Sequence, residues 1–143
     1  METSNSDQAR DTLLAEFIRR EGLPDKVLPA LNIALTHKSY SNEFRAGLDP
    51  GLDRHNQRLE FLGDSVLGLV IAHHFYASKR KTAEGGLTRL KAMTVCESAL
   101  KQIADTLDLG QMLRMGKGEI ATGGLARTSN LADAMEAVIG AIH

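Results

Sequence analysis

The amino-acid sequence predicts an all-α fold. No stretch of its 143 residues shows sustained alternation of apolar and polar side chains, which is the pattern of half-buried strands. Several windows instead repeat apolar residues every three or four positions, as helices that pack on a core do. Glycine and proline separate these windows, and the chain has no internal repeat. We therefore expect one helical domain over residues 7–143, after a polar segment, 1–6, that we expect to be disordered.

Residue types that favour helix ends bound the first two predicted helices. Apolar side chains recur on one face of residues 7–20, and Gly22 and Pro24 follow where this helix should end. Asp25 is the expected N-cap of a second helix, which extends to Leu35.

The rest of the chain alternates between connections and longer helices. The expected connections are 36–42, which leaves the second helix, a loop at 43–54, a turn at 82–86, and the glycine-rich segment 110–124 with one helical turn at 112–115. The expected helices are 56–77, 87–107 and 130–143.

Composition limits the class of protein. Hydrophobic residues make up 43% of the chain and aromatic residues only 4%, which predicts an aliphatic core. Seventeen basic residues against 18 acidic ones give a net charge of -1, so a polyanionic partner would have to meet local patches or metal ions. The single cysteine, Cys96, excludes an internal disulfide, and we expect it to be buried in a helix. No signal-peptide pattern or membrane-length apolar run is present, so we expect a cytoplasmic protein without membrane contact.

The central predicted helix carries an unusual pair of acidic residues. Apolar residues fall on all its sides, which predicts a buried helix. Glu60 and Asp64 nevertheless lie one turn apart on a stripe that continues through Leu67 and Ile71. Two buried carboxylates are unfavourable unless a cation meets them. Gly63, which destabilises a helix interior by about 1 kcal/mol relative to alanine, indicates close approach of another backbone or a ligand.

The last predicted helix carries a second pair. Asp133 and Glu136 are three residues apart and share a face with the small residues Ala137 and Gly140, which would let a neighbouring helix come close. If the two pairs meet, four carboxylates surround one cavity. Hard divalent cations such as Mg²⁺ or Mn²⁺ suit such a cluster, and pairs of such metals serve phosphoryl transfer.

Structural interpretations of these residues compete with the metal site. Asp133 can be half of a capping box that begins at Asn130, and Glu136 can lie on a solvated helix face. Glu60 and Asp64 can form salt bridges with Arg58 or Lys91.

Two further features have a structural and a functional interpretation. The basic run Lys79-Arg80-Lys81 is ordinarily a solvated helix end favoured by the helix dipole, and phosphate contact is the functional alternative. His73 and His74 do not follow a glutamate by three positions, which disfavours a di-iron bundle site.

Four segments resemble the ribonuclease III family in order and spacing. The most specific is RLEFLGDSVL at residues 58–67. The others are ALTHKSY at 34–40, EGGLTR at 84–89 and LADAMEAVIGAI at 131–142.

The resemblance implies an all-helical, homodimeric endonuclease domain that cuts double-stranded RNA with Mg²⁺, or with Mn²⁺ as a substitute, in RNA processing such as that of ribosomal RNA. Two-metal hydrolysis would give 5′-phosphate and 3′-hydroxyl ends with two-nucleotide 3′ overhangs. Matching positions make Glu60, Asp64, Asp133 and Glu136 the metal ligands, with Asp64 and Glu136 also catalytic.

Other matching positions imply supporting roles. Glu84 matches an acidic residue of the composite valley at the dimer, and Phe61 matches an aromatic residue that packs into the partner. Gln57 departs from the family, which usually has an acidic residue at this auxiliary position. In the family, one more helix and a double-stranded-RNA-binding domain usually follow the position at which this sequence ends, His143. Without that basic domain, we expect weak, salt-sensitive RNA binding. A non-cleaving RNA-binding or ribosome-associated relative is the alternative function.

Overall fold

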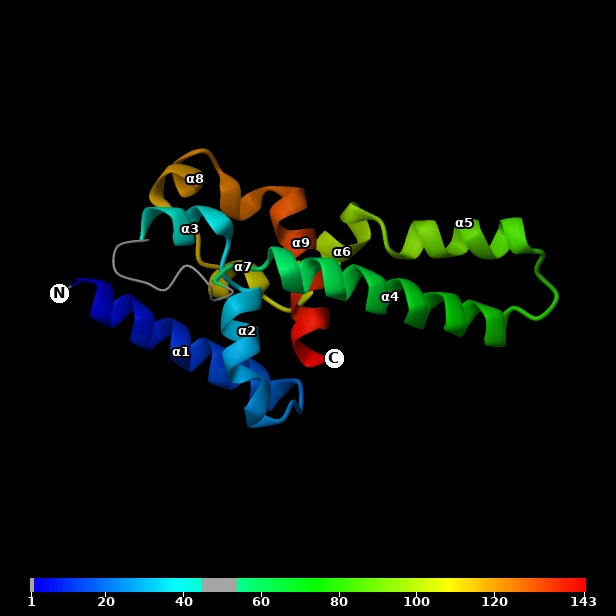
Figure 1. Cartoon of the computed structure of the whole chain (residues 1–143), viewed down its shortest axis with the longest axis horizontal. Helices are drawn as coiled ribbons and strands as arrows, with labels where there is room; N and C mark the ends of the chain where they lie inside the picture. Colours follow the sequence, from blue (N-terminus) through cyan, green and yellow to red (C-terminus); the bar gives the residue numbers. More distant parts are fainter. Residues whose placement is uncertain (1, 45–53) are drawn as a thin grey trace.

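The computed structural model describes residues 2–44 and 54–143, with side chains described from Gln8 onwards. Residues 45–53, most of the predicted loop 43–54, lie outside this range. The described residues form helices and contain no strand, so the all-α prediction is confirmed (Figure 1). The helices are α1 (Glu2–Arg20), α2 (Leu28–Ala34), α3 (Lys38–Glu43), α4 (Gln57–Ser78), α5 (Glu84–Thr94), α6 (Glu97–Thr106), α7 (Leu109–Met112), α8 (Lys117–Ala121) and α9 (Thr128–Ile142), with 3₁₀ turns η1 (Asp25–Val27) and η2 (Gly124–Ala126).

The core of the molecule surrounds α9. This helix packs against α2, α4, α6 and α7, and its buried residues include Leu131, Ala134 and Val138. The largest side chains that are fully buried come from the helices around it and from the residue after α2: Leu14, Leu31, Leu109 and Leu35. We call α1, α2, α6, α7 and α9 the body, because they enclose this aliphatic core.

A buried arginine joins three elements of the body. Arg10 of α1 donates through Nε to the carbonyl oxygen of Met112 at 2.7 Å and through Nη2 to that of Leu35 at 2.9 Å. Its Nη1 also donates to the Asn32 side chain. The charged guanidinium thus donates hydrogen bonds to carbonyl groups at the ends of α2 and α7, which have no N–H partner within their own helices.

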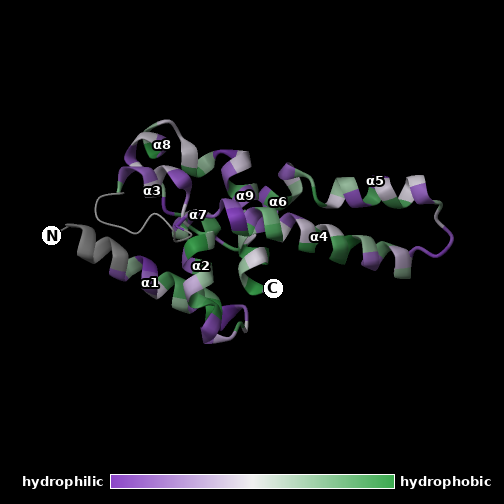
Figure 2. Cartoon of the chain, in the orientation of Figure 1, coloured by the Kyte–Doolittle hydropathy of each residue, from purple (hydrophilic) through white to green (hydrophobic). Residues whose placement is uncertain are grey.

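Helices α4 and α5 extend from the body as an antiparallel hairpin, which we call the hairpin (Figure 1). Gly63 is the only residue of α4 that is buried, and α5 has none. Phe61, Leu69 and Tyr76 are 78%, 71% and 75% exposed. The prediction of a buried central helix is therefore wrong for the single chain. The apolar pattern is present along the hairpin (Figure 2), but no element in the described part of this chain covers its outer side.

The hairpin is anchored where α4 crosses α9. A Cβ added at Gly63 would overlap the carbonyl oxygen of Glu136, and one added at Gly140 would overlap that of Leu59. Both positions therefore require glycine, because the two backbones are in direct contact. This confirms the prediction that Gly63 admits close approach of another backbone and that Gly140 lets a neighbouring helix come close.

The element boundaries differ from prediction in the first third of the chain. Helix α1 begins at Glu2, so it includes the polar residues 2–6 that were expected to be disordered. Asp25 starts η1 and does not cap α2, because Pro24 fixes an extended backbone before the 3₁₀ turn. The segment 36–42 contains most of α3, which His37 caps by accepting a hydrogen bond at Nδ1 from the Ser39 N–H.

The predicted helix 87–107 is divided into α5 and α6. Cys96 has extended backbone angles between them, after Thr94 and Val95, whose β-branched side chains disfavour continuation of the helix. Cys96 is exposed, so the prediction that it is buried in a helix is wrong.

The glycine-rich segment contains two short helices, and the predicted turn at 112–115 is wrong. Helix α7 ends at Met112, and Arg114 lies in an isolated parallel bridge with Thr36. The described residues contain no helix that is long and apolar enough to cross a bilayer.

Candidate metal centre

Three carboxylates from the hairpin and the body meet at the α4–α9 crossing. Glu60 projects from α4, and Asp133 and Glu136 project from α9. Each offers one oxygen, and these oxygens all lie within 4.8 Å of one another. The glycine contact described above sets this spacing, because it brings the two helix backbones together beside Glu136.

Asp64, the fourth predicted ligand, lies at the edge of this group. Its side chain is exposed on α4 one turn after Glu60, and it is not one of the three clustered carboxylates. Its charge nevertheless raises the pKa of Glu136 more than the charge of any other residue does. The structure therefore brings three predicted ligands together and places the fourth beside them.

Burial and mutual repulsion disfavour the state in which these four carboxylates are all ionised. Desolvation, followed by the charges of Asp64, Glu60 and Asp133, raises the pKa of Glu136 to about 7. Burial is also the main cause of the raised pKa values of Glu60 and Asp133. The second cause is the negative charge of Asp133 in the case of Glu60, and the negative charge of Glu97 in the case of Asp133. A bound cation would remove this repulsion.

The structural interpretations of these carboxylates gain little support. The cation that lowers the pKa of Glu60 is Lys38 of α3. The predicted salt-bridge partners were Arg58 and Lys91, and neither is among the charges that act on this carboxylate. Asn130 lies inside α9 rather than at its cap, and its Nδ2 donates to the carbonyl oxygen of Gly124 at 3.0 Å. The capping-box interpretation of Asp133 is therefore wrong.

The donor set suits a small hard cation. All the clustered ligand atoms are carboxylate oxygens, which Mg²⁺ and Mn²⁺ prefer. Ligand oxygens of an octahedral Mg²⁺ are about 3.0 Å apart when they are adjacent and about 4.2 Å apart when they are opposite. The three clustered oxygens, which lie within 4.8 Å of one another, would therefore have to draw together around such an ion.

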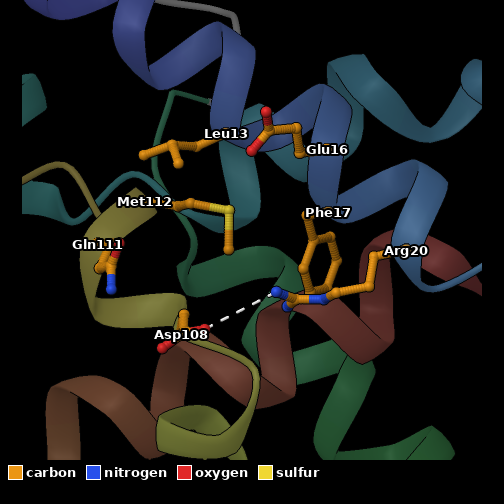
Figure 3. Close-up of a pocket in the computed structure, with 7 residues that line it drawn as sticks. All are labelled: Leu13, Glu16, Phe17, Arg20, Asp108, Gln111 and Met112. Atoms are coloured by element: carbon orange, nitrogen blue, oxygen red, sulfur yellow. Dashed lines mark ion pairs between the residues drawn. The ribbon is translucent and has the colours of Figure 1, made fainter.

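A polar cavity of about 310 Å³ adjoins the cluster. Glu60 and Asp133 form part of its wall, and Lys38 and Arg127 line it with positive charge. Arg127 is held by Glu119, which accepts a hydrogen bond from its Nη1 at 2.8 Å. A second cavity, of about 70 Å³, lies between α1 and α7, where Arg20 faces Asp108 at 3.7 Å (Figure 3). It lacks a carboxylate cluster and is too small for a nucleotide.

Sequence reasoning missed the residues that surround the carboxylates. His37, Lys38, Glu119 and Arg127 reach the cavity from the cap of α3, from the start of α3, from α8 and from the turn before α9. No spacing rule links these segments, since only the tertiary fold brings them to α4. The match of ALTHKSY to the family was the one available signal for His37 and Lys38.

The remaining predicted site residues lie at different distances from the cluster. Gln57 is the first residue of α4 and lines the polar cavity. Glu84 is the first residue of α5, which begins at the outer end of the hairpin (Figure 1). Its carboxylate accepts a hydrogen bond from the Thr88 hydroxyl at 2.6 Å. Phe61 points to solvent beside the cluster. Within one chain, therefore, Gln57 is close to the carboxylates and Glu84 is remote from them.

Comparisons with known proteins identify the family of this chain. A family model described as Ribonuclease-III-like matches residues 29–143. Ribonuclease 3 of Moorella thermoacetica is 47% identical over 137 residues, which cover 96% of this chain and 56% of that protein. Ribonuclease 3 of Desulforamulus reducens is 53% identical over 110 residues, 77% of this chain and 43% of that protein. The chain thus spans about half the length of these relatives.

A solved structure extends the likeness to three dimensions. The nuclease domain of ribonuclease III from Campylobacter jejuni superimposes with a TM-score of 0.78 at 38% identity, covering 89% of this chain and 82% of that one. Coverage of this extent includes at least part of both the hairpin and the body. The chain belongs to the ribonuclease III family.

Proposed function

We propose that this chain is a metal-dependent endoribonuclease domain that cuts double-stranded RNA. The observation that carries the proposal is the convergence of Glu60, Asp133 and Glu136, with oxygens within 4.8 Å, in a chain of the ribonuclease III family. A polyanionic substrate needs positive charge at the reacting phosphate, and a chain of net charge -1 has to gain that charge locally.

Glu60, Asp64, Asp133 and Glu136 would hold two Mg²⁺ ions, with Mn²⁺ as a substitute. Such ions, when bound, neutralise charge on the phosphate and lower the pKa of the attacking water. The protein contributes the fixed spacing at the α4–α9 crossing and the partial burial of the carboxylates. In-line hydrolysis leaves a 5′-phosphate and a 3′-hydroxyl.

The exposed face of the hairpin supports a homodimer. Phe61, Leu69, Tyr76 and Met93 are each at least two-thirds exposed, although a monomeric protein rarely leaves a large apolar patch in water. The Campylobacter jejuni structure is described as flexible in a region involved in dimer formation. We propose that a second copy covers this face, so that two centres cut the two strands and leave two-nucleotide 3′ overhangs.

Cleavage of a perfect RNA duplex in low salt with Mg²⁺ tests the proposal. The parent chain is expected to cut, and Glu136→Gln, which keeps the size of the side chain but removes its charge, is expected not to. A matched control is Glu16→Gln, which changes an exposed carboxylate of α1 in the body. Equal cleavage by the parent and Glu136→Gln would contradict the proposed centre, and so would the absence of any cleavage by a folded parent.

Gln57 favours one alternative, a non-cleaving RNA-binding relative. Its neutral amide lines the polar cavity at a position where the family usually has an acidic residue. Under this alternative the parent binds duplex RNA without cutting it, and Gln57→Glu gains cleavage. If the parent cuts, the alternative fails.

A further inference from the structure

His37 lies on the wall of the polar cavity, and the proposed metal centre gives it no role. It shares this wall with Glu60 and Asp133, two of the proposed ligands, and with the cations Lys38 and Arg127. The ring is half-buried, and burial lowers its pKa, so the imidazole is uncharged near neutral pH. An uncharged imidazole has one nitrogen that donates a hydrogen bond and one that accepts, and its neighbours decide which is which.

The contacts of Nδ1 fix the tautomer of His37. The backbone N–H of Ser39 can only donate, and it donates to Nδ1 at 3.3 Å, so Nδ1 carries no proton. The Ser39 hydroxyl lies 2.8 Å from the same nitrogen and accepts a hydrogen bond from the Gly116 N–H at 2.9 Å. That hydroxyl can therefore donate its own proton to Nδ1. The one ring proton of the uncharged imidazole is then on Nε2.

The Nε2–H group can reach a ligand. In the part of the chain that the structure describes, no residue accepts a hydrogen bond from Nε2. Nor is Nε2 among the described side-chain nitrogens that are buried without a partner, so it is accessible to solvent. Because Ser39 holds the other edge of a ring that lines the cavity, this N–H is a fixed donor on the cavity wall.

The backbone around His37 keeps the donor in place. The His37 N–H donates to the carbonyl oxygen of Arg114 at 2.9 Å. The Glu43 carboxylate, at the end of α3, accepts hydrogen bonds from the N–H groups of Lys117 and Gly118 at 2.9 and 3.2 Å. Helix α3 is therefore joined to the start of α8 as well as to the residue that precedes it. A donor held in this way loses little conformational freedom when it binds a ligand.

An uncharged donor adds selectivity to this wall rather than charge. Lys38 and Arg127 already supply positive charge for a phosphate group. A neutral N–H instead selects an oxygen at one position on the substrate, because a hydrogen bond needs a short distance and good alignment. The oxygens of an RNA strand that lie next to a phosphate linkage are the ribose 2′-oxygen and the non-bridging phosphate oxygens, and the 2′-oxygen also distinguishes RNA from DNA.

We infer that Ser39 holds His37 as the Nε2–H tautomer and that this N–H donates a hydrogen bond to a backbone oxygen of the RNA strand beside the reacting phosphate. The oxygen is either a ribose 2′-oxygen or a non-bridging phosphate oxygen. This inference rests on the proposed ribonuclease function. It gives His37 a substrate contact in addition to its role as the cap of α3. Ser39 is a positioning residue, because it acts only through the ring.

The tautomer can be measured without any substrate. In a chain with ¹⁵N-labelled histidine, the ring nitrogens of His37 are the pair of NMR signals that His37→Asn lacks. Near neutral pH, we expect the chemical shift of an unprotonated nitrogen for Nδ1 and that of a protonated nitrogen for Nε2. The opposite assignment would overturn the inference, whether or not the chain cuts RNA.

The same signals test Ser39. Ser39→Ala removes the hydroxyl and should increase the share of the Nδ1–H tautomer, and Ser39→Thr, which restores a hydroxyl, should return it to the value of the parent. A purely structural role of Ser39 would leave the tautomer unchanged, which would contradict the positioning role.

Two substitutions of His37 separate substrate contact from helix capping. Asparagine is a preferred N-cap, and it keeps an acceptor for the Ser39 N–H but does not reach as far as Nε2. Glutamine reaches about as far as Nε2 with its amide N–H, but it is not a preferred cap. We expect His37→Asn to keep the Tm of the parent and to lose about tenfold in kcat/KM for duplex RNA, the effect of one hydrogen bond. His37→Gln should have a lower Tm but cut faster than His37→Asn.

The matched control is His143→Asn. It changes an exposed histidine at the end of α9 that is remote from Asp133, and it should change neither Tm nor kcat/KM. If His37→Asn cuts as fast as the parent and only His37→Gln is impaired, the ring serves only as a cap and the inference is wrong.

Modified substrates identify the oxygen that His37 contacts. If Nε2–H binds a 2′-oxygen, a single 2′-deoxynucleotide at the mapped cut slows the parent but has little further effect on His37→Asn. If it binds a phosphate oxygen, the deoxynucleotide slows both proteins equally, and a single phosphorothioate beside the cut slows the parent more than His37→Asn. Equal effects of both modifications on the two proteins would overturn the contact.

The remaining outcomes separate this inference from the proposed function. If the parent cuts duplex RNA and His37→Asn matches it, only the inference is wrong. If the folded parent neither binds nor cuts duplex RNA, the proposed function fails and the RNA contact of His37 fails with it.

Discussion

The body and the hairpin use apolar residues in opposite ways. In the body, Leu14, Leu31 and Leu35 are completely buried against helices of the same chain. In the hairpin, Leu69 and Val70 are 71% and 55% exposed although α4 is among the more apolar helices. The comparison teaches that an apolar helix pattern indicates burial but does not say in which chain the covering surface lies.

The two regions meet at the proposed site. Asp133 and Glu136 come from the best-buried helix of the body, and Glu60 comes from the first turn of the hairpin. The contact of Gly63 with the Glu136 backbone joins them without any intervening side chain. The proposed metal centre therefore depends on a packed body and on a hairpin that, among the described residues, is held at one end only.

The largest expected effect is in the body. Leu31→Ala removes a fully buried side chain, and the transfer and cavity terms should lower the free energy of unfolding by about 2–5 kcal/mol. Leu28→Ala in the same helix is the control, because Leu28 is 40% exposed and should cost much less. Urea denaturation of both variants measures the difference. Equal losses would contradict the assignment of the core.

The next effect is at the junction of the two regions. Gly63→Ala places a methyl group on the Glu136 carbonyl oxygen, and the resulting overpacking should destabilise the chain by about 1–3 kcal/mol. Gly85→Ala in α5 meets no atom within 4 Å and should stabilise the helix by up to about 1 kcal/mol. Thermal unfolding distinguishes the two signs. A stabilising Gly63→Ala would show that the helices do not touch there.

A substitution on the exposed face of the hairpin should have a smaller effect on stability than the two changes above. It should have a specific effect on self-association. Leu69→Ser should change the unfolding free energy of the dilute monomer by less than about 0.5 kcal/mol. It should instead weaken self-association, because it places a hydroxyl in the proposed interface. Sedimentation equilibrium measures this. Ile142→Ser, at a 43% exposed position outside the hairpin, should leave the dimer unchanged.

A pH dependence of the metal-free chain is also expected at the junction of the two regions. The pKa of Glu136 in the folded chain is about 7, above its ordinary value of 4.5. Between these values the folded chain binds more protons than the unfolded chain, so the free energy of unfolding should fall as pH rises from 4.5 to 7. Glu136→Gln should flatten this dependence, and added Mg²⁺ should reverse it. A fall that persists in Glu136→Gln would assign the effect to other groups.

Much of the fold followed from periodicity and from glycine. The central and last helices were predicted to within two residues at each end, because long periodic segments specify their own secondary structure. The break at Cys96 and the short helix α3 were not predicted, since tertiary contacts and local caps decide such short elements. The exposure of α4 could not be predicted, because periodicity marks an apolar face without saying what packs on it.

The carboxylates of the site could be selected from the sequence, but their surroundings could not. Glu60, Asp133 and Glu136 were selected by helical spacing and by their neighbours Gly63 and Gly140. Whether Asp64 completes the ligand set stays a prediction, because its side chain lies outside the three clustered carboxylates. Lys38, Glu119 and Arg127 reach the cavity from segments distant in sequence, which spacing within one helix cannot reveal.

Mapping the cuts on both strands of an end-labelled RNA duplex tests most directly whether the hairpin joins two carboxylate centres on one substrate. With Mg²⁺, the parent should cut both strands with an offset that leaves two-nucleotide 3′ overhangs. Leu69→Ser should lose the paired cuts at concentrations where it is monomeric. Unpaired single-strand cuts by the parent, at a rate that does not depend on Leu69, would contradict the account.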